Sequence, residues 1–261
     1  MNKNRVLWQF KKQIFSLCKR YVNRYNGENN DNIKTNGEMR LMRSVLPHCK
    51  IVFDVGANSG DWTDLALKIN PNLKIHCFEP SSKTFQRLKT RDFGKKIILN
   101  NFGLSSIAKD LPLYVFEEGA GLNSLYMRRG LEDGYGRNSQ SKTELIRVET
   151  LDGYCQQANI SFIDFLKVDV EGHELEVFKG GLKLLSQGKI KQIQFEYGGC
   201  NIDAGVLLKD LFDFFIPYQY TFYQVYPKCL RHILRYDQRL ENYQYKNFLI
   251  IHKNLRTKFF I

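Results

Sequence analysis

The stretch Phe53-Asp54-Val55-Gly56-Ala57-Asn58-Ser59-Gly60-Asp61-Trp62 decides the fold. It continues an apolar run that starts at Ile51 and is typical of a buried strand, and it then breaks into two glycines separated by three residues. The residues that follow predict a helix over 61–69. A strand, a tight turn and a helix in this order let the backbone approach a ligand of nucleotide size at the helix N-terminus.

The next apolar run, Leu73 to Phe78, ends in Glu79-Pro80. An acid that closes the second strand, roughly twenty residues after a glycine turn, is placed to accept hydrogen bonds from two ribose hydroxyls. The turn lacks the middle glycine of the dinucleotide fingerprint, because Ala57-Asn58-Ser59 separates its two glycines. Taken alone, the turn also fits a plain connection between a strand and a helix.

The two acids together narrow the choice of ligand. Asp54 ends the first strand and Glu79 ends the second, an arrangement that suits an adenosine carrying an amino-acid tail, with a ribose and an ammonium group but no pyrophosphate. S-adenosylmethionine has this shape. We expect Glu79 to take the ribose hydroxyls, Gly56 to allow close backbone approach, and Asp54 to hold the methionine ammonium, directly or through water.

The rest of the predicted cofactor site lies close to these residues. Trp62 fits this site and the apolar core equally well. The remaining predicted cofactor-binding residues are Ala57, Asn58, Gly60, Asp61 and Trp62 in the turn and helix start, Pro80 after the second strand, and Gly103 and Leu104 beside the adenine.

Three motifs resemble the FkbM-type S-adenosylmethionine-dependent methyltransferases. They are FDVGANSGDWT from Phe53, CFEPS from Cys77 and LKVDVEGHELEVFKGG from Leu166, with weaker matches in NFGLSS from Asn101 and VETLD from Val148. The resemblance runs from about residue 38 to 200 and extends to the last strand near 247–253. It implies an α/β fold with a Rossmann-like, seven-stranded class I methyltransferase sheet, helices on both faces and an antiparallel last strand. It also implies methyl transfer to a hydroxyl on a sugar or a secondary metabolite.

The third motif holds the candidate catalytic residues. A sugar hydroxyl is a poor nucleophile until a general base or a divalent ion draws off its proton. We expect Asp169 to contact the methionine end of the cofactor or a metal, and Glu171 or His173 to take the proton. Glu196, at the end of the neighbouring strand, is expected to be a second orienting carboxylate.

Two alternatives stay open for this motif. His173 also fits a helix-cap residue that faces solvent, and Lys167 is expected to be an internal partner for one of the acids. The carboxylates permit a magnesium-type site of oxygen ligands, and they equally permit a base that works without metal.

Hydrophobic periodicity predicts the remaining elements. The predicted helices are 38–46, 61–69, 82–90 (with Ser81 as N-cap) and 203–215, and the predicted strands are 51–55, 74–79, 97–102, 163–170, 190–197, 220–226 and 247–253. A lid-like insertion occupies about 105–150, with strands over 111–116 and 144–149. Its polar middle holds Asn123, Tyr126, Arg128 and Arg129, which could bind a sugar; a mobile surface loop is the alternative.

Composition sets further bounds. The 261 residues predict one methyltransferase domain over 36–261, preceded by an arm and linker over 1–35. The six cysteines lack metal-site spacing and are expected to be reduced thiols, which favours a cytoplasmic protein. We recognise no signal peptide and no apolar run of transmembrane length.

The arm accounts for much of the net charge of +12. Met1 to Gly27 contains seven Lys or Arg and no acid, and Leu7, Phe10, Ile14, Leu17, Tyr21 and Tyr25 recur at helical spacing. This pattern is typical of a helix on an anionic membrane, here the inner face. The alternative is a helix that docks on its own domain or on a partner subunit in a homo-oligomer. Nucleic acid is not expected, because no basic and aromatic ladder is present.

The sequence therefore predicts an O-methyltransferase whose acceptor is a small molecule or a glycan. Our leading interpretation is methylation of a sugar hydroxyl in glycan or glycolipid biosynthesis. Methylation of a polyketide or another small-metabolite hydroxyl is the alternative acceptor, and a non-catalytic partner subunit that only binds the cofactor is the alternative class. A nicotinamide dehydrogenase is disfavoured by the missing middle glycine.

Overall fold

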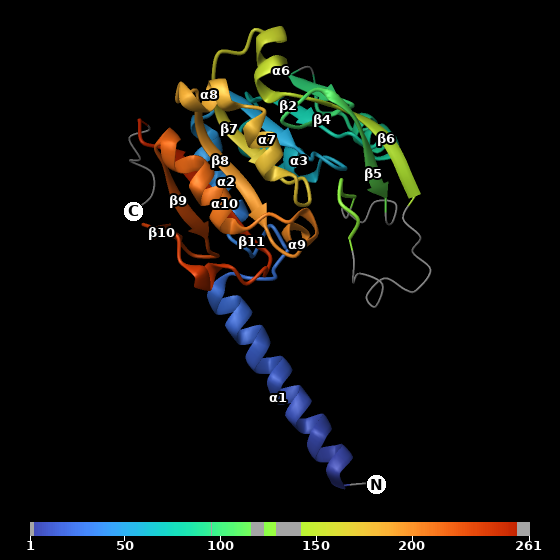
Figure 1. Cartoon of the computed structure of the whole chain (residues 1–261), viewed down its shortest axis with the longest axis vertical. Coiled ribbons are helices and arrows are strands. Elements are labelled where there is room, and N and C mark those ends of the chain that lie inside the picture. The colour runs from blue at the N-terminus through green and yellow to red at the C-terminus, as the bar shows by residue number, and fades with distance from the viewer. Residues whose placement is uncertain (1–2, 95, 116–122, 129–141, 255–261) are drawn as a thin grey trace.

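The computed structural model describes residues 3–94, 96–115, 123–128 and 142–254. The described residues form an eight-stranded sheet in the order β10-β9-β11-β8-β7-β1-β2-β3 and a three-stranded sheet in the order β4-β6-β5 (Figure 1). The strands of the large sheet are β1 (Ile51–Val55), β2 (Lys74–Phe78), β3 (Ile97–Asn100), β7 (Ile163–Val168), β8 (Ile190–Tyr197), β9 (Tyr220–Val225), β10 (Leu230–Ile233) and β11 (Lys246–His252).

The strand directions confirm the α/β class and the antiparallel last strand. The five strands β3, β2, β1, β7 and β8 are parallel, and β11 runs antiparallel to both β8 and β9. Seven of the eight strands match the predicted sheet. The eighth, β10, pairs antiparallel with β9 at the edge, and its short polar sequence carries too little apolar pattern to be recognised.

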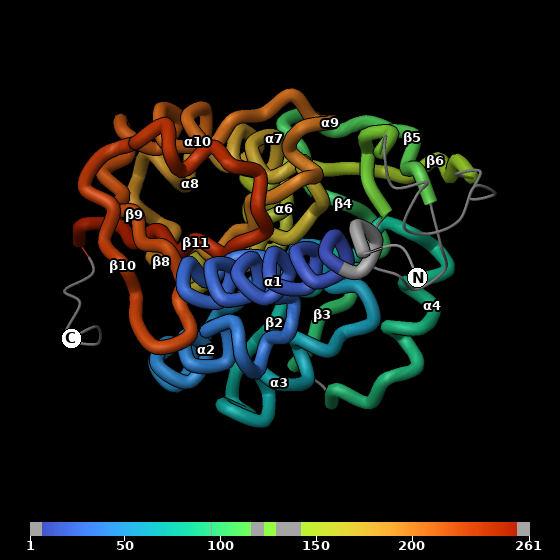
Figure 2. Tube along the Cα trace, turned by 90° about the horizontal axis from the view of Figure 1, so that it is seen from below, coloured from blue at the N-terminus to red at the C-terminus, as the bar shows by residue number. Residues whose placement is uncertain are grey.

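Helices cover both faces of the large sheet (Figure 2), each over its own apolar core. Strand residues alternate between the two cores, so that Phe53 packs under one set of helices and Val52 under the other. The first face carries α6 (Leu151–Gln157), α7 (Glu174–Lys179), α8 (Leu182–Ser186) and α10 (Leu208–Phe215), and the second carries α2 (Glu38–Val45), α3 (Asp61–Ile69) and α4 (Ser82–Lys89).

The predicted insertion over about 105–150 contributes two of the three strands of the small sheet, and the third strand, β4, lies just before it. The small sheet contains β4 (Gly103–Leu104), β5 (Lys109–Val115) and β6 (Lys142–Glu149). Leu113, Ile146 and Val148 form its own apolar cluster. This cluster lines the cavity described below, so the insertion forms one wall of the candidate site.

Several predicted boundaries are confirmed to the residue, including those of β1, α3 and β8. The single helix predicted over 203–215 was wrong. It is two helices, α9 (Cys200–Ala204) and α10, and Gly205 ends α9 in a left-handed conformation with φ of 66°. The apolar positions that suggested one helix, from 207 to 215, all lie after this break. They belong to α10 and gave no sign that the helix is interrupted at Gly205.

The N-terminal arm is helical, as predicted, and α1 (Lys3–Asn26) extends away from the domain (Figure 1). The stripe residues Leu7, Phe10, Ile14, Leu17 and Tyr21 are all exposed, so docking on the chain's own domain was wrong. The predicted linker lies against the domain, where buried Glu28 pairs with buried Lys246 at 2.9 Å. No helix in the described part of the chain is both long and apolar enough to cross a membrane.

Candidate active site

The glycine turn after β1 is held between the ends of two other strands. The amides of Gly56 and Ala57 both donate to the carbonyl oxygen of Phe78, each at 3.0 Å. Gly56 has φ of 81°, and a Cβ there would lie 1.8 Å from the carbonyl oxygen of Asp169. Only glycine allows this approach, which brings the cofactor turn against the motif that follows β7.

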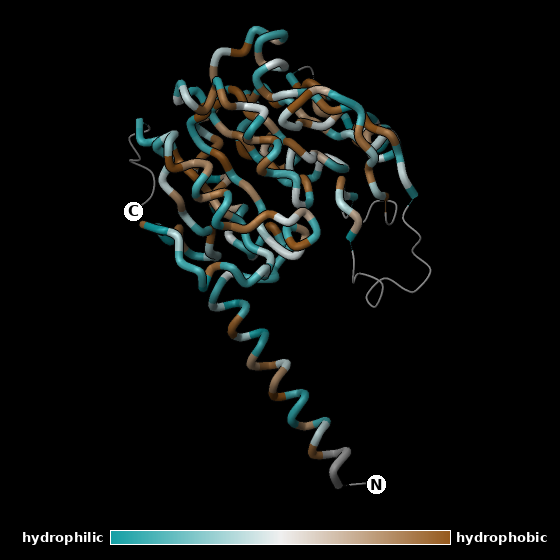
Figure 3. The backbone as a smooth tube through the Cα atoms, in the orientation of Figure 1, coloured by the Kyte–Doolittle hydropathy of each residue, from teal (hydrophilic) through white to brown (hydrophobic). Residues whose placement is uncertain are grey.

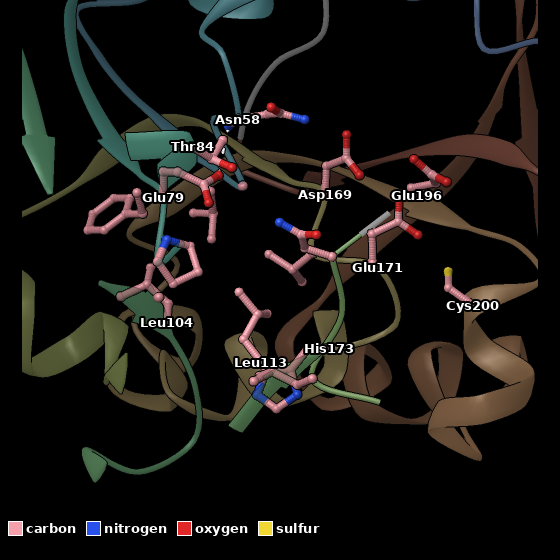
Figure 4. Close-up of a pocket in the computed structure, with 18 of the residues that line it drawn as sticks. Asn58, Glu79, Thr84, Leu104, Leu113, Asp169, Glu171, His173, Glu196 and Cys200 are labelled. Atoms are coloured by element: carbon pink, nitrogen blue, oxygen red, sulfur yellow. Dashed lines mark hydrogen bonds between the residues drawn. The ribbon is translucent and has the colours of Figure 1, made fainter. Parts of the chain in front are cut away.

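A cavity of about 480 Å³ opens beside this turn, beyond the carboxyl ends of the parallel strands (Figure 4). Its two sides differ in chemistry. An apolar side is formed by Pro80, Leu104, Leu113, Ile146 and Val148, and an acidic side by Asp169, Glu171 and Glu196. In Figure 4 the three acids lie together, away from Leu104 and Glu79.

Glu79 lies in the cavity wall and is nearly buried. Its Oε2 accepts from the amide of Asn58 at 2.9 Å, and its Oε1 accepts from the amide of Ser81 at 3.0 Å. Burial raises the pKa of Glu79 to about 7, although these two bonds act in the opposite direction. Each carboxylate oxygen keeps one lone pair for a ligand.

Two carboxyls of the acidic side, Glu171 and Glu196, have raised pKa values. Burial, followed by the charge of Asp169, raises the pKa of Glu171 to about 7, against the effect of Arg128. Burial and Asp169 also raise the pKa of Glu196 well above its usual value. At neutral pH a carboxyl of this kind exchanges protons readily, as a general base must.

Asp54 is not among the residues that line the cavity, so its predicted role at the methionine ammonium stays a prediction. It is fully buried, accepts from the Thr63 hydroxyl at 2.7 Å, and has Lys167 Nζ at 3.4 Å. The strand register explains this contact, because Asp54 and Lys167 are direct neighbours across β1 and β7.

Lys167 is the internal partner that the sequence predicted. Its ammonium lies 3.2 Å from Asp169 as well as 3.4 Å from Asp54. Burial alone would lower the pKa of Lys167, but Asp169, Asp54 and Glu38 together raise it above its usual value. The charged ammonium therefore holds Asp169 at the cavity edge from below.

Four further residues of the predicted cofactor site do not reach the cavity. Ala57 is core, and Trp62 is buried with its ring stacked on Phe165 at 6.1 Å. A Cβ at Gly60 would lie 2.6 Å from Phe93, so packing requires this glycine. Asp61 points to solvent and pairs with Arg91. The structure does bring Gly56, Asn58, Pro80, Gly103 and Leu104 to the cavity, as expected.

His173 lies in the cavity wall and is buried, so the solvent-facing alternative was wrong. Its Nε2 is 2.9 Å from the Ser105 hydroxyl and its Nδ1 is 2.9 Å from the Tyr126 hydroxyl. Burial lowers the pKa of His173 to about 4. The ring is therefore neutral at pH 7 and ties the insertion to the catalytic motif.

The described segment 123–128 of the insertion closes over the same motif. Arg128 Nη1 donates to Glu171 at 2.7 Å, and its Nε lies 3.7 Å from Asp203 on α9. The Ser124 hydroxyl donates to the carbonyl oxygen of Glu171 at 2.8 Å. Asn123 and Arg128 line the cavity as predicted, whereas Arg129 lies outside the described residues.

Sequence reasoning missed the role of Glu174. It is almost fully buried, and its Oε1 accepts from the amides of Val170 and Gly172 at 3.2 Å each, which holds the turn between Asp169 and His173. An acid two residues after a glycine was the available signal. Tyr245 and Cys200 also line the cavity without having been singled out.

The sequence did not decide whether the acids bind a metal. The described residues address this question only through the distances between their side chains. No three His, Cys, Asp or Glu side chains among them come together closely enough to hold an ion.

The chain is similar to several named methyltransferases. It is 33% identical to methyltransferase sdnD of Sordaria araneosa over 160 residues, which cover 52% of this chain and 61% of that protein. It is 27% identical to the hexuronic acid methyltransferase AglP of Haloferax volcanii over 67% of this chain and 69% of that protein. It is 26% identical to the 2-O-methyltransferase NoeI of Sinorhizobium fredii over 60% and 67%, respectively.

Among solved structures, the fold overlaps loosely with the plantazolicin methyltransferase BpumL in complex with SAH, at 9% identity and a TM-score of 0.43 over 90% of each chain. A model of the methyltransferase FkbM domain matches residues 54–236, which include the glycine turn, the acidic cluster and the insertion. The chain is therefore a methyltransferase and belongs to the FkbM methyltransferase family.

Proposed function

We propose that this methyltransferase transfers a methyl group from S-adenosylmethionine to a hydroxyl of a sugar, in glycan or glycolipid assembly. One observation carries the proposal. A single cavity joins an apolar side, next to Glu79, to a group of three carboxylates, two of which, Glu171 and Glu196, have raised pKa values. The names of AglP and NoeI, a hexuronic acid and a 2-O-methyltransferase, support a sugar acceptor.

The residues present fit the cofactor. Glu79 has two free lone pairs that suit the ribose hydroxyls, and the missing side chain at Gly56 lets the turn lie against Asp169 beside the cavity. Pro80, Leu104 and Val148 offer an apolar surface of the kind that an adenine ring requires. When bound, the cofactor supplies a methyl group on a sulfonium, which is already a good leaving group.

The protein's own contribution is then alignment and proton removal. Glu171, with a pKa of about 7, is the proposed proton acceptor, and its bond to Arg128 fixes its orientation. Asp169, held from below by Lys167, is proposed to orient the methionine end of the cofactor. His173 is a poorer proton acceptor, because both of its ring nitrogens already have hydroxyl partners.

The carboxylates also leave a divalent ion as an alternative way to acidify the hydroxyl. Activity that is lost with a chelator and restored by magnesium would assign Asp169, Glu171 or Glu196 as ligands. Unchanged activity in the chelator would favour the base without metal.

Ligand binding tests the first half of the proposal. A ligand present at a hundredfold excess over its Kd stabilises the fold by about 2.7 kcal/mol. S-adenosylhomocysteine should raise the melting temperature, and NAD should not. A response to NAD alone would overturn the proposal.

An acceptor screen tests the second half. We expect transfer of labelled methyl from S-adenosylmethionine to free or lipid-linked sugars, including hexuronic acids, and none to phenolic or polyketide hydroxyls. The reverse preference would support the small-metabolite alternative. Cofactor binding without transfer to any acceptor would support the non-catalytic partner subunit.

A further inference from the structure

Helix α1 is 24 residues long, and the large apolar side chains that the structure describes along it are exposed. At 1.5 Å per residue it is about 36 Å long. Exposed large apolar side chains follow it from one end to the other: Leu7, Trp8, Phe10, Ile14, Phe15, Leu17, Tyr21, Val22 and Tyr25. A helix gains most of its stability in a protein from packing of its apolar face, so this face requires a surface that covers it.

The apolar residues of the stripe gather on one side of α1, and the cations lie mostly away from it, with Lys11 and Arg24 at its edges. Leu7, Phe10, Ile14, Leu17 and Tyr21 follow one another at steps of three and four and form one stripe. Trp8, Phe15 and Val22, at steps of seven, widen it. Lys12, Lys19 and Arg20 fall on the other side, and Figure 3 shows the alternation of apolar and polar residues along the helix.

The charge of α1 has one sign. Between Lys3 and Asn26 there are seven cations and no acid. The aromatic residues Trp8, Tyr21 and Tyr25 are of the types that favour the boundary between lipid and water. A wide apolar side combined with cations alone matches an anionic lipid surface.

Cations continue from the base of α1 onto the domain. A cavity of about 420 Å³ there is lined by Asn26 of α1 and by Arg231, Leu234 and Arg235 from β10 and the residues after it. The two acids in its lining, Glu28 and Asp237, are paired with Lys246 and Arg239. Leu234 is 85% exposed. The domain therefore presents further basic and apolar residues beside the helix, as a surface that reaches the lipid next to α1 would.

We propose that α1 lies on an anionic lipid surface with its stripe in the lipid, and that the β10 region next to its base contacts the headgroups. A second copy is disfavoured as the cover, because two such helices would bring fourteen cations together with no acid between them (seven in each). Nucleic acid would engage the cations and leave the stripe uncovered. Lipid binding of this kind does not depend on the proposed reaction.

The test uses the full chain with vesicles of phosphatidylcholine containing phosphatidylglycerol, and with vesicles of phosphatidylcholine alone. We expect cosedimentation with the anionic vesicles at low salt, weaker binding as salt rises, and little binding to the neutral vesicles. Of the two tryptophans, Trp62 is 6% exposed and Trp8 is 61% exposed. The emission of Trp8 should shift to the blue on binding, and the Trp8→Phe variant should lose this shift.

Two variants separate charge from apolar contact. Replacement of Lys11, Lys12, Lys19 and Arg20 by Gln should weaken binding to anionic vesicles on the order of a hundredfold or more. The variant Gln9→Phe, Phe10→Gln, Gln13→Ile, Ile14→Gln keeps composition and charge but breaks the stripe, and it should also weaken binding. Affinity for S-adenosylhomocysteine, if the wild type binds it, and the melting temperature report that each variant is folded.

Three results would overturn the proposal. The first is no binding of the full chain to anionic vesicles at low salt. The second is a dimer without lipid that the stripe variant converts to monomer, which would assign the stripe to a second copy. The third is binding to single-stranded DNA that displaces the vesicles and that the stripe variant retains.

Discussion

Asp169 and Glu171 stand two residues apart but are held by different partners. Lys167 contacts Asp169 from the sheet, whereas Arg128 contacts Glu171 from the insertion. We predict that Glu171→Gln lowers turnover about a hundredfold or more, the usual scale of lost general-base help. Asp169→Asn should act more on cofactor affinity.

Steady-state kinetics and calorimetry with S-adenosylhomocysteine check this division. In the wild type, turnover should fall as pH drops below about 7, because a base with that pKa becomes protonated. Normal turnover in both variants would show that the proton acceptor lies elsewhere, with Tyr126 as the next residue to change.

The titration of Glu174 should change the free energy of unfolding measurably with pH. Burial raises its pKa from 4.5 to about 7. Such a carboxyl stabilises the folded chain below pH 4.5, and this contribution is lost as pH rises through 7. Glu174→Gln removes the titration. Relative to wild type, the variant should therefore gain up to about 3 kcal/mol in unfolding free energy between pH 4.5 and pH 8.

Urea unfolding at the two pH values measures this gain, and Glu176→Gln on the same helix is the matched control. The pKa of Glu176 is lowered, because its bonds to Lys179 and Ser106 outweigh its partial burial. Its replacement should cost stability at pH 8 and not at low pH. A loss at pH 8 in both variants would mean that the pKa of Glu174 is lowered, and no change with pH in Glu174→Gln would mean that this carboxyl titrates in its ordinary range.

At the scale of elements, the turn between β1 and α3 depends on the missing side chain at Gly56. Gly56→Ala would add a left-handed conformational cost of about 1–2 kcal/mol and a contact of 1.8 Å with Asp169. We predict a loss of at least about 3 kcal/mol in stability, or loss of S-adenosylhomocysteine binding by the folded variant.

The variant Gly94→Ala separates the conformational cost of the side chain from the contact with Asp169. Gly94 has φ of 74°, close to that of Gly56, but a Cβ there would meet nothing within 4 Å. This variant should lose only about 1 kcal/mol and bind the cofactor normally. Equal losses in the two variants, by thermal unfolding, would mean that backbone conformation and not the approach to Asp169 makes Gly56 necessary.

At the scale of the whole molecule, α1 should be separable from the domain, whereas the segment after it should not. Removing residues 1–25 should leave stability and S-adenosylhomocysteine affinity unchanged, since the stripe residues are exposed and every residue that lines the cavity lies beyond residue 30. Glu28→Gln should cost about 3–5 kcal/mol, because it leaves the buried ammonium of Lys246 without its counter-charge.

Thermal unfolding of the truncated chain and of the Glu28→Gln variant, side by side, tests both statements. A truncated chain that unfolds or changes its oligomeric state would show that α1 is structural. A stable Glu28→Gln variant would show that Asn242, which also contacts Lys246, is sufficient to hold it.

Local patterns in the sequence were enough for much of the fold. The apolar runs of β1, β7 and β8 mark central strands, and the glycine turn and Glu79 mark the cofactor end of the sheet. They could be recognised because each depends on residues close together in the chain. The edge strand β10 and the break at Gly205 were missed, because short polar strands and single glycines carry little periodicity.

The sequence by itself determined the α/β class, the turn and the set of acids at the strand ends. Only the tertiary structure decided which acids line the cavity, because the register of β1 against β7 places Asp54 beside Lys167 and below the cavity wall. The tertiary structure likewise decided that His173 is buried and neutral at pH 7, because its partners Ser105 and Tyr126 are 68 and 47 residues away in the chain. Such contacts depend on how distant segments pack, and no pattern within a short stretch of sequence encodes them.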